Sequence, residues 1–482
     1  MRPLEDFLIE KSLVLFGTGT TAGKLNEQIS VAGIRIDYFS DNDLTKWGEN
    51  FQQHLIVAPS ELRTERDVIV IASEYEAEIA EQLTRMGFVM HHNCLLHTRL
   101  LIRNNKIEYC WDTKVLSELK AIVPLDDLKA TSLEKIPVLQ SDYRFLCQNP
   151  INVSGSQYPS FMIPQQSYPL KDVNIYIFEQ GTTTGDNGVI LTAEGYLIRE
   201  FSTFTTLALN IWDAQRVKID VIGNKDVAVL KHTVAVTTTQ WSGANYYHWM
   251  MEELPRFYLL GAYKEPIDYY ISNYTMRAFQ QETLECMGIP IHSIIKSSNI
   301  YAIQAEKLVV PYSPAYDSGY VSKWICNFLN RLFSSALQID ERKYHKHIYI
   351  ARGNAKNRKV VNEEDVIEYL TNMGFQIVYL ERHSVREQAA IFYNAEVIIG
   401  PHGAGLTNLV FCRKQTKVLE LFSPMYAPIM FWNICENQDL IYHCAVGDRT
   451  DFEYTERVGV YVNEKDIHVN IEDISRFVSL YL

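Results

Sequence analysis

The chain of 482 residues is too long for one hydrophobic core, and its length suggests about three domains. Hydrophobic residues make up 47% and charged residues 21%, a balance that excludes a disordered chain and is typical of a folded soluble protein. The net charge of −13, without a long run of lysine or arginine, argues against nucleic acid as a partner.

The start of the chain has no pattern for export or membrane insertion. Glu5, Asp6, Glu10 and Lys11 precede the first apolar run, so a signal peptide is not expected. No apolar run reaches the roughly 18 to 20 residues that span a bilayer. The eight cysteines form no C-x-x-C pair and no metal or disulfide spacing. These features predict a cytoplasmic protein, with peripheral association at the inner face of a membrane left open.

Residues 1–103 form the first expected domain, in which apolar runs alternate with helical patterns. Such alternation predicts a parallel sheet with helices on its faces, here a Rossmann-like accessory domain. In "LVLFGTGTTAGKL", Gly17, Gly19 and Ala22 have the G-x-G-x-x-G/A spacing, and Asp37 follows Gly17 by 20 residues, near the place of a ribose-binding acid. A single fingerprint is weak. A site for NAD or a sugar nucleotide, and a domain used only for docking or assembly, both stay open.

The middle of the chain is less regular. Residues 104–172 contain six prolines and little periodicity, which predicts a connector. Residues 173–340 combine short β-rich runs with helical patterns around residues 244–263 and 320–337. They form the second expected domain.

Residues 341–482 return to a clean alternation and form the third expected domain, a second doubly wound parallel sheet. The strands are "HIYIAR", "FQIVYL", "EVIIG" and "KVLELF", and the helices are residues 362–373, 384–394 and 405–412. Asn362 and Gly374 bound the first of these helices. Ser384 with Glu387 has the spacing of a capping box at the start of the second.

The turn after "EVIIG" carries the strongest functional signal. Ligands of open α/β sheets bind at the carboxyl ends of the strands, and this turn lies at such an end. Gly403, Ala404 and Gly405 let a phosphate approach the backbone, while the amides and dipole of the next helix, which contains Thr407, attract an anion. His402 can add a hydrogen bond to phosphate or sugar. A helix terminus contributes only about 0.3 to 2 kcal/mol, so cations should join it.

Cationic side chains follow the first strand of the same sheet. "YIARGNAKNRK" supplies Arg352, Lys356, Arg358 and Lys359, and a guanidinium can grip phosphate oxygens bidentately. "KVLELF" adds Glu420, a carboxylate suited to ribose hydroxyls. Each feature alone has an ordinary explanation: a tight turn, a solvated basic loop or a structural histidine. Together on neighbouring strand ends they predict a site for a nucleotide diphosphate.

A second site is indicated by "SGANYYHWMMEELPRF", where a helical pattern begins. His248 and Glu252 are four residues apart and share one face of a helix. A carboxylate beside an imidazole is a common arrangement for a general base, with Glu252 as base and His248 as partner, or with the roles reversed. The alternative is a solvated pair on a surface helix.

These stretches resemble, in the same order, the sequence blocks of glycosyltransferase family 61, whose bacterial members are often labelled capsular polysaccharide biosynthesis proteins. "NYYHWMMEELPRF" is similar to the first block. The donor-side blocks are similar to "ARGNAKNRKVVNEEDV", "HSVREQAAIFYNAEVIIGPHGAGLTNLVFC" and "VLELF". The resemblance covers about residues 173–482.

The resemblance implies a GT-B fold, in which two Rossmann-like domains face each other, with residues 173–340 on the acceptor side and 341–482 on the donor side. It implies inversion at the anomeric carbon without an essential metal. Glu420 would face the ribose, and His248 and Glu252 the acceptor. The donor diphosphate would be held by Arg352, Arg358, His402, Gly403, Ala404 and Gly405. Glu387 matches a family position but is interpreted first as the capping-box residue.

The sequence therefore predicts an enzyme that moves a sugar from a nucleotide-diphosphate donor to a hydroxyl of a glycan or glycoconjugate in surface polysaccharide synthesis. We expect the donor to be a UDP-sugar. No cofactor is required. As the bond to phosphate breaks, Arg352, Arg358 and the helix terminus stabilise the leaving diphosphate. The competing hypotheses are an NAD-dependent enzyme or sensor centred on the N-terminal domain and a non-catalytic nucleotide-binding subunit. A homo-oligomer is left open.

The front of the chain departs from the family plan, because many relatives begin with a membrane anchor or signal. Here the Gly17 fingerprint stands in that place. The triplet Asp41-Asn42-Asp43 resembles the acid-x-acid motif that binds a divalent metal in the other large glycosyltransferase fold. Such triplets are frequent by chance, and we expect no metal site.

Overall fold

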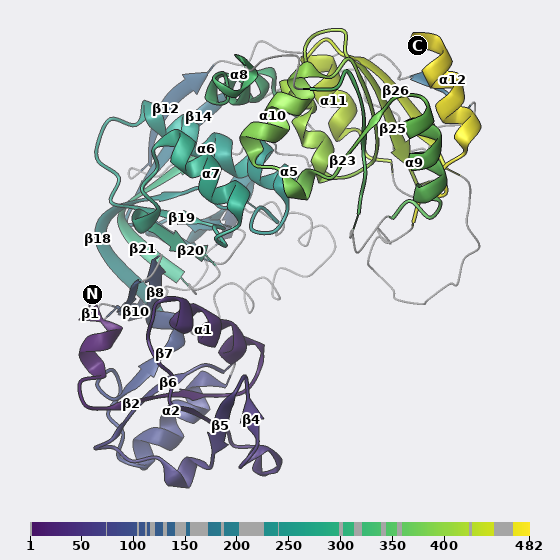
Figure 1. Cartoon of the computed structure of the whole chain (residues 1–482). Coiled ribbons are helices and arrows are strands. Elements are labelled where there is room, and N and C mark those ends of the chain that lie inside the picture. Colours follow the sequence, from purple (N-terminus) through teal and green to yellow (C-terminus); the bar gives the residue numbers. More distant parts are fainter. Residues whose placement is uncertain are drawn as a thin grey trace.

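The computed structural model is a mixed α/β protein whose sheets follow one another along the chain (Figure 1). It describes residues 2–73, 75–103, 106–110, 113–115, 121–128, 133–139, 151–154, 172–184, 188–201, 226–239, 241–297, 302–312, 321–338, 344–353, 359–423, 427–447 and 466–482. No helix within these ranges has the length and apolar character needed to cross a bilayer.

The N-terminal sheet has the strand order β4-β5-β3-β2-β6-β7. Its strands are β2 (Ser12–Phe16), β3 (Tyr38–Ser40), β4 (Asn50–Phe51), β5 (His54–Val57), β6 (Asp67–Ile71) and β7 (Cys94–Leu96). All neighbours pair in parallel except β4 with β5. Alternate residues of β2 pack on opposite faces, against α1 (Thr20–Val31) on one side and α2 (Glu76–Arg85) on the other. Strands β3 to β5 lie on one side of β2 and strands β6 and β7 on the other, so the strand order reverses between β2 and β6.

The central sheet is mixed, with eleven strands among the described residues. The strands are β10 (Thr113–Val115), β11 (Ala121–Val123), β12 (Leu133–Leu139), β14 (Val173–Glu179), β15 (Thr182–Thr184), β16 (Val189–Leu191), β17 (Tyr196–Ile198), β18 (Asp226–Val236), β19 (Tyr269–Ser272), β20 (Ile294–Lys296) and β21 (Ala302–Pro311). Only β21-β18-β19-β20 and the pair β11-β17 run parallel. A Rossmann-like sheet was expected here. Strands β15, β16 and β17 follow each other through links too short for the crossover that parallel strands need, so they pair antiparallel. Strands β14 and β15 both pair antiparallel with β21.

The predicted connector, residues 104–172, contributes strands to several sheets. Strand β9 (Lys106–Tyr109) lies between β1 (Arg2–Pro3) and β8 (Leu100–Arg103) in a three-stranded sheet that contacts β20. Strands β10, β11 and β12 join the central sheet, and β13 (Ile151–Asn152) joins the C-terminal one. Most of these strands are too short to show an alternating pattern, which is why the sequence indicated only irregular structure.

The C-terminal sheet is parallel throughout, with the order β13-β26-β25-β24-β22-β23. Its further strands are β22 (His347–Ile350), β23 (Gln376–Val378), β24 (Val397–Pro401), β25 (Lys417–Phe422) and β26 (Ile441–Val446). The helices are α9 (Glu363–Asn372), α10 (Val385–Asn394), the 3₁₀ helix η15 (Ala404–Phe411), α11 (Met430–Asn437) and α12 (Ile471–Tyr481). The strand order reverses between β22 and β24, which is where ligands of such sheets bind.

The local signals of this region are largely present. Ser384 and Glu387 form the capping box, with the Glu387 carboxylate accepting from the Ser384 amide at 2.9 Å. Gly374 follows α9 with φ +83. Two expectations differ. The side chain of Asn362 bonds the backbone of Val469 instead of capping α9, and the helix expected at 405–412 is 3₁₀ rather than α.

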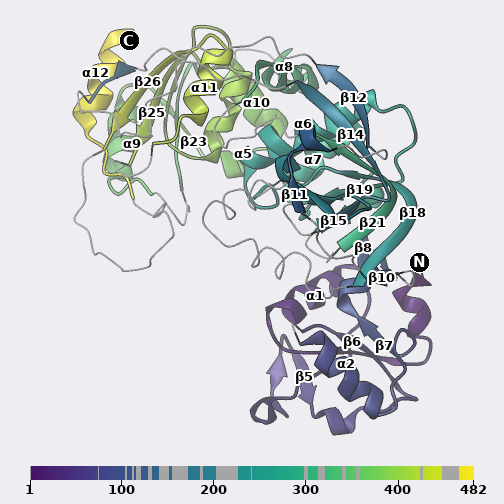
Figure 2. The same ribbon diagram turned by 180° about the vertical axis from the view of Figure 1, so that it is seen from behind.

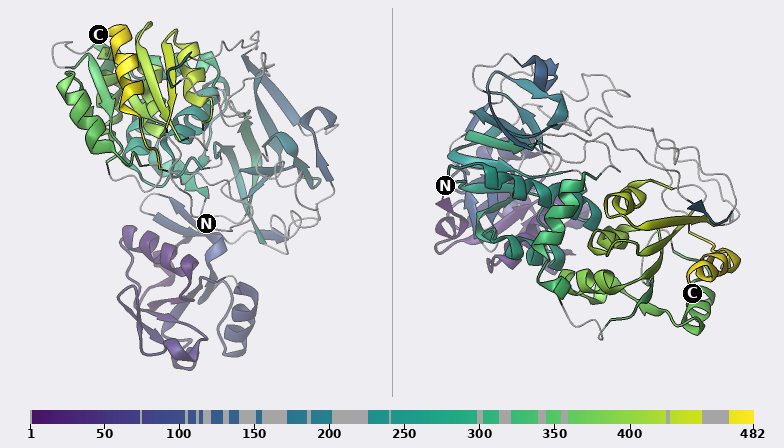
Figure 3. Two further views of the ribbon diagram at one scale, coloured as in Figure 1. Left: turned by 90° about the vertical axis from the view of Figure 1, so that its right-hand side faces the viewer. Right: turned by 90° about the horizontal axis from the view of Figure 1, so that it is seen from above.

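The central helices connect the central and C-terminal sheets (Figure 1; Figure 2). They are α5 (Tyr246–His248), the π-helical turn η8 (Trp249–Glu253), α6 (Leu254–Leu259), α7 (Ala278–Met287) and α8 (Lys323–Leu332). Their buried side chains belong to the same hydrophobic cluster as those of β24, η15 and α11. The two units therefore share one core, while the N-terminal unit lies against another side of the central unit (Figure 3).

Candidate functional site

The structure brings Arg352 to the His402 turn. Arg352 lies two residues beyond β22, and His402 directly follows β24, the neighbouring strand. Arg352 Nη1 donates to the backbone oxygen of His402 at 3.0 Å. The Arg352 amide donates to Oε1 of Glu363, at the start of α9, at 2.9 Å. Both residues lie at the carboxyl edge of the sheet where the strand order reverses.

The glycines of the turn have packing reasons. A Cβ at Gly403 would lie 2.0 Å from Nη1 of Arg352, so the guanidinium fills the space that any other residue would need. A Cβ at Gly405 would lie 2.6 Å from Cδ1 of Leu380. Both glycines were predicted to let a phosphate approach. The structure shows that Gly403 also admits Arg352 and that Gly405 also admits Leu380.

The amides of the turn divide into two groups. The amide of His402 donates to the carbonyl of Leu421 at 2.8 Å. The amides of Gly403, Ala404 and Gly405 have no acceptor among the described residues, as is usual in the first turn of a helix. Ala404 and Gly405 are partly exposed. The turn therefore offers backbone donors to an anion.

Glu420 does not face a ligand, which corrects the predicted ribose contact. The side chain is fully buried in β25. Its Oε1 lies 2.6 Å from Nδ1 of His402, and its Oε2 accepts from the hydroxyl of Tyr442 at 2.6 Å. Both faces of β25 are covered, so a side chain on this strand points into the protein. Glu420 therefore positions the ring of His402, which is itself only 3% exposed.

The remaining predicted donor residues are distributed differently. Lys356 and Arg358 lie outside the described residues. Lys359 is exposed, and its amide donates to Oδ1 of Asp466 at 2.8 Å. Thr407 is fully buried, and its hydroxyl has no hydrogen-bond partner within the described ranges. Of the two predicted cations that the structure describes, Arg352 lies at the turn and Lys359 does not.

His248 and Glu252 form a buried pair. His248 Nδ1 lies 2.8 Å from Glu252 Oε1, and the two side chains are 10% and 8% exposed. This burial excludes the alternative of a solvated pair on a surface helix. Glu252 lies in η8, a π-helical turn. Such turns are rare in proteins, and those that occur are often found at functional sites.

A series of ring contacts joins this pair to the His402 turn. The centroid distances are 5.4 Å for His248 and Tyr247, 5.8 Å for Tyr247 and Phe431, and 5.1 Å for Phe431 and His402. Two aromatic side chains, Tyr247 of the central unit and Phe431 of the C-terminal unit, therefore lie between the two predicted histidines.

Hydrogen bonds fix the same two units against each other. The hydroxyl of Tyr246 donates to Oδ1 of Asn408 in η15 at 2.8 Å, and Asn408 Nδ2 donates to Oε1 of Gln388 at 2.8 Å. Glu282 of α7 accepts the amide of Val385 at the start of α10 at 2.7 Å. The relative position of the two predicted sites is therefore built into the shared core.

Sequence analysis missed a third polar group, the fully buried Glu253. Its carboxylate accepts from the hydroxyls of Ser242, Ser272 and Thr237 and from the amide of Asn273. These partners lie at or beyond the carboxyl ends of β18 and β19. Burial raises the pKa of Glu253 to about 7, although the hydrogen bonds act in the opposite direction. Because the partners come from separate segments, no local pattern could have revealed this group.

The N-terminal fingerprint is explained by packing. Gly17 has φ +120, and a Cβ there would lie 2.6 Å from the carbonyl oxygen of Ala72 at the end of β6. Ala22, in the first turn of α1, is fully buried. Gly19 precedes α1 and has open space around it. Two of the three fingerprint positions are therefore set by contacts within the protein.

Asp37 lies at the opposite edge of the N-terminal sheet, which corrects its predicted place near a ribose. It precedes β3, and its Oδ2 accepts from the amide of Leu13 at 3.0 Å. The run "IRIDYF" was interpreted as a strand, but only its last two residues pair with β2. The acid that follows β3 at the edge of Gly17 is Asp41.

The acid-x-acid triplet is held by its own neighbours. Asp41 Oδ2 accepts from Oγ1 of Thr18 at 2.5 Å, and Nζ of Lys46 lies 3.4 Å from the same oxygen. Asp43 caps a short 3₁₀ helix by accepting from the amide of Thr45 at 3.0 Å. Within the described ranges, no three His, Cys, Asp or Glu side chains gather as a metal-binding group.

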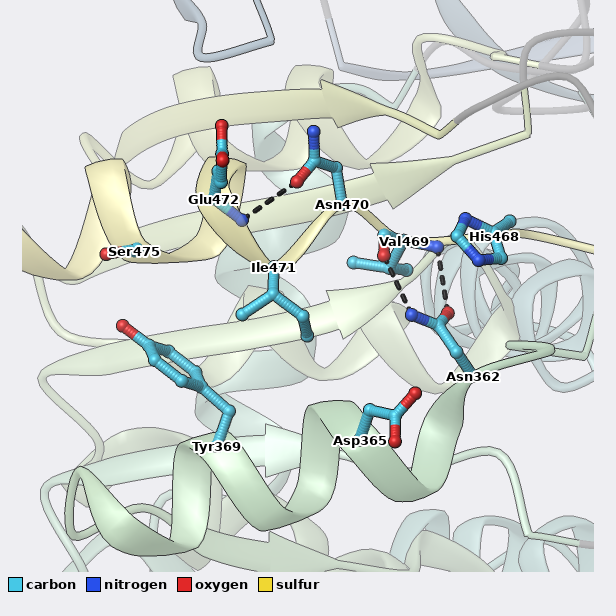
Figure 4. Close-up of a pocket in the computed structure, with 9 residues that line it drawn as sticks. All are labelled: Asn362, Asp365, Tyr369, His468, Val469, Asn470, Ile471, Glu472 and Ser475. Carbon is cyan, nitrogen blue, oxygen red and sulfur yellow. Dashed lines mark hydrogen bonds between the residues drawn. The ribbon is translucent and has the colours of Figure 1, made fainter.

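A pocket of about 570 Å³ lies between α9 and the start of α12 (Figure 4). Asn362 and Val469 are joined across it by hydrogen bonds of 2.8 and 3.0 Å. Asp365 and Glu472 also line it, and their charges would repel a diphosphate. None of the predicted donor residues lines this pocket, so we do not assign it to the donor.

Comparison with known proteins identifies the class of this site. Residues 246–419 match the family model described as Glycosyltransferase 61, and residues 9–92 match a model described as C2185-like, N-terminal. The first range contains the His248–Glu252 pair, Arg352 and the His402 turn. The chain therefore carries a glycosyltransferase 61 domain.

Curated relatives match over short stretches. A beta-1,2-xylosyltransferase of Oryza sativa subsp. japonica is 45% identical over 60 residues, which is 12% of this chain and 11% of that protein. A beta-1,2-xylosyltransferase of Arabidopsis thaliana is 31% identical over 104 residues, 19% and 20% of the two chains. An EGF domain-specific O-linked N-acetylglucosamine transferase of Drosophila melanogaster is 36% identical over 78 residues, 16% and 15%. The chain thus spans a fifth or less of the length of each.

Proposed function

We propose that this protein is an inverting, metal-independent glycosyltransferase of surface polysaccharide synthesis. It moves a sugar from a nucleotide-diphosphate donor, with UDP as the nucleotide to test first, to a hydroxyl of a glycan or glycoconjugate. The observation that carries the proposal is the contact of Arg352 with the His402 turn, at the strand reversal and inside the glycosyltransferase 61 domain. The relatives named above transfer xylose or N-acetylglucosamine, which supports a sugar donor.

The donor diphosphate would bind at the Gly403 turn. The amides of Gly403, Ala404 and Gly405 provide hydrogen-bond donors, and the Arg352 guanidinium beside them is a cation that matches phosphate oxygens. As the glycosidic bond breaks, the leaving diphosphate gains charge next to these groups. Stabilisation of that charge by fixed donors supports departure of the leaving group.

The acceptor would bind at His248. Glu252 holds Nδ1 of His248, so the ring can present Nε2 to the acceptor hydroxyl and remove its proton. This geometry favours His248 as the base and Glu252 as the residue that orients it, the reverse of our first assignment. The deprotonated oxygen then attacks the anomeric carbon from the face opposite the diphosphate, which inverts its configuration.

The architecture of the proposed enzyme is GT-B, with an additional Rossmann-like domain at residues 1–103. The parallel C-terminal sheet and its strand reversal support a donor domain of this kind. The proposal includes a cytoplasmic location. Peripheral membrane association and a homo-oligomer are separate questions for experiment.

A thermal-shift experiment with UDP, GDP and NAD tests the donor assignment. UDP at 100 times its Kd should stabilise the folded protein by about 2.7 kcal/mol, because it binds the folded state only. Arg352→Ala should lose this stabilisation. Lys46→Ala, which removes a cation from the N-terminal sheet instead, should keep it. Stabilisation by NAD alone, lost in Lys46→Ala, would overturn the proposal in favour of an N-terminal NAD site.

A further inference from the structure

Trp241 stands out in the loop that precedes α5. Its side chain is 59% exposed, and its backbone has φ +67. Left-handed backbone is uncommon for residues other than glycine, and for a bulky residue it is strained. Such strain persists where the surrounding structure enforces it, so the neighbours of Trp241 decide its meaning.

Hydrogen bonds hold the loop on both sides of Trp241. The hydroxyl of Ser242 donates to the buried Glu253 carboxylate, and the carbonyl of Gly243 accepts from Oγ1 of Thr275 at 2.6 Å. Asn273 Nδ2 donates to the carbonyl of Thr239 at 2.5 Å. The loop is thus fastened to the carboxyl edge of the central sheet while its one large side chain is left exposed.

The indole lies directly against the proposed base. The centroids of Trp241 and His248 are 5.2 Å apart, with the ring planes at 59°. Glu252 holds Nδ1 of the same histidine. The exposed indole therefore borders the place where an acceptor hydroxyl would reach His248.

We propose that Trp241 is the platform on which a pyranose ring of the acceptor stacks, which rests on the function proposed above. A pyranose presents a face of C–H groups with positive partial charge, and the face of an indole is negative. An aromatic side chain also loses little conformational entropy on binding, because it has only two rotatable bonds. Stacking on Trp241 orients the sugar so that one hydroxyl meets His248.

The alternative is that Trp241 only covers His248. A covering role needs bulk and apolar character but no left-handed backbone, since an ordinary loop conformation could supply both. The left-handed φ therefore distinguishes the two roles. If the surrounding loop imposes it, the exposed position of the Trp241 side chain is a fixed feature of the structure. Glycine adopts φ +67 without strain, whereas alanine does not.

Fluorine NMR on the full chain labelled with 5-fluorotryptophan tests the platform. The seven tryptophans give separate reporters, and Trp241→Phe assigns the signal of Trp241. We expect this signal to shift with at least one of the methyl glycosides of glucose, galactose, mannose, xylose and N-acetylglucosamine. Mannitol, which has hydroxyls but no ring face, should leave it unchanged. The signal of Trp47, in the N-terminal unit, is the internal control.

Three results would overturn the proposal. The Trp241 signal stays in place with every glycoside, it moves equally with mannitol, or it moves only with phosphatidylglycerol vesicles, which would assign Trp241 to a membrane surface. UDP-induced stabilisation is measured on the same sample. If UDP stabilises the protein but no glycoside shifts the Trp241 signal, only the platform is contradicted. If a glycoside shifts the Trp241 signal but UDP does not stabilise the protein, only the donor site is contradicted.

Two further variants test the backbone premise. Trp241→Gly should unfold at a higher temperature than Trp241→Ala, because only glycine relieves the left-handed conformation at this position. Equal or reversed stabilities would show that the loop does not impose this conformation, and the argument for a specifically built platform would fail.

Discussion

The turns at Gly17 and Gly403 both lie where the strand order of a sheet reverses, after β2 in one sheet and after β24 in the other, yet their surroundings differ. Each follows a strand at the edge where the strand order reverses. Beside Gly17, the cation of Lys46 lies 3.4 Å from the carboxylate of Asp41. Beside Gly403, the Arg352 guanidinium donates to the backbone of the turn itself. At the first edge the cation pairs with a carboxylate of the same domain, whereas at the second it lies at the turn that we propose binds the diphosphate.

The difference shows what a glycine motif can and cannot indicate. Gly17 is required by a left-handed φ and by its contact with the end of β6, and these reasons hold with or without a ligand. Gly403 is required by the approach of the Arg352 guanidinium, a cation. The motif predicts close approach of atoms, and only the identity of the approaching group points to a ligand.

The largest expected effect concerns the proposed base, which the neighbouring central unit supplies on the side of the Gly403 turn. Glu252→Ala should lower sugar transfer by about 10² to 10⁴, because proton transfer by an oriented base contributes this much. UDP affinity should not change, since Glu252 lies outside the donor turn. Glu252→Gln, which keeps the shape of the side chain, controls for misfolding. Unchanged turnover in both variants would remove the pair from the mechanism.

Glu253 extends the comparison to the carboxyl ends of β18 and β19 in the central sheet, where burial raises the pKa of a carboxylate although the buried Arg256 acts in the opposite direction. Its pKa of about 7 in the folded protein lies above the ordinary value of 4.5. The folded state therefore holds a proton that the unfolded state releases, and this stability is complete below pH 4.5 and is lost as pH rises through 7. The loss is on the order of 3 kcal/mol.

Glu253→Gln should flatten this pH dependence and unfold at higher urea than the native chain above pH 7. Urea denaturation between pH 4.5 and 8 measures the effect. Glu285→Gln, an exposed position on α7, should leave the pH dependence as it is. A native slope that persists in Glu253→Gln would place the titrating group elsewhere.

Local patterns predicted the C-terminal sheet and the proximity of Arg352 to the His402 turn, because parallel strands bring their ends to one edge. The i to i+4 spacing likewise predicted the contact of His248 with Glu252. Asp37 was misplaced because the strand begins later than its apolar run suggested. The role of Glu420 was missed because its direction depends on helices that cover both faces of β25. Contacts between distant segments cannot be inferred from local periodicity.

Adding one methyl group to a glycine of each turn should have different effects on UDP affinity. Gly403→Ala should reduce UDP affinity by about 10- to 100-fold, because its Cβ displaces Arg352 and a charge-assisted hydrogen bond contributes about 1.5 to 3 kcal/mol. Gly19→Ala adds the same methyl group in open space at the N-terminal turn and should leave UDP affinity unchanged. Isothermal titration with UDP gives both affinities. Equal losses in the two variants would contradict the distinction between the turns.

The smallest expected effect concerns the hydrogen bond between Tyr246 and Asn408, which ties the helix after the Gly403 turn to the central helices. Tyr246→Phe removes the hydrogen bond to Asn408, a loss of about 1 kcal/mol that corresponds to roughly 2 to 4 °C in unfolding temperature. Tyr75→Phe, at an exposed position of the N-terminal unit, is the matched control. UDP affinity should stay constant, because Asn408 keeps its bond to Gln388. A larger fall in transfer rate than in stability would show that the two units must keep their register for the sugar to pass between them.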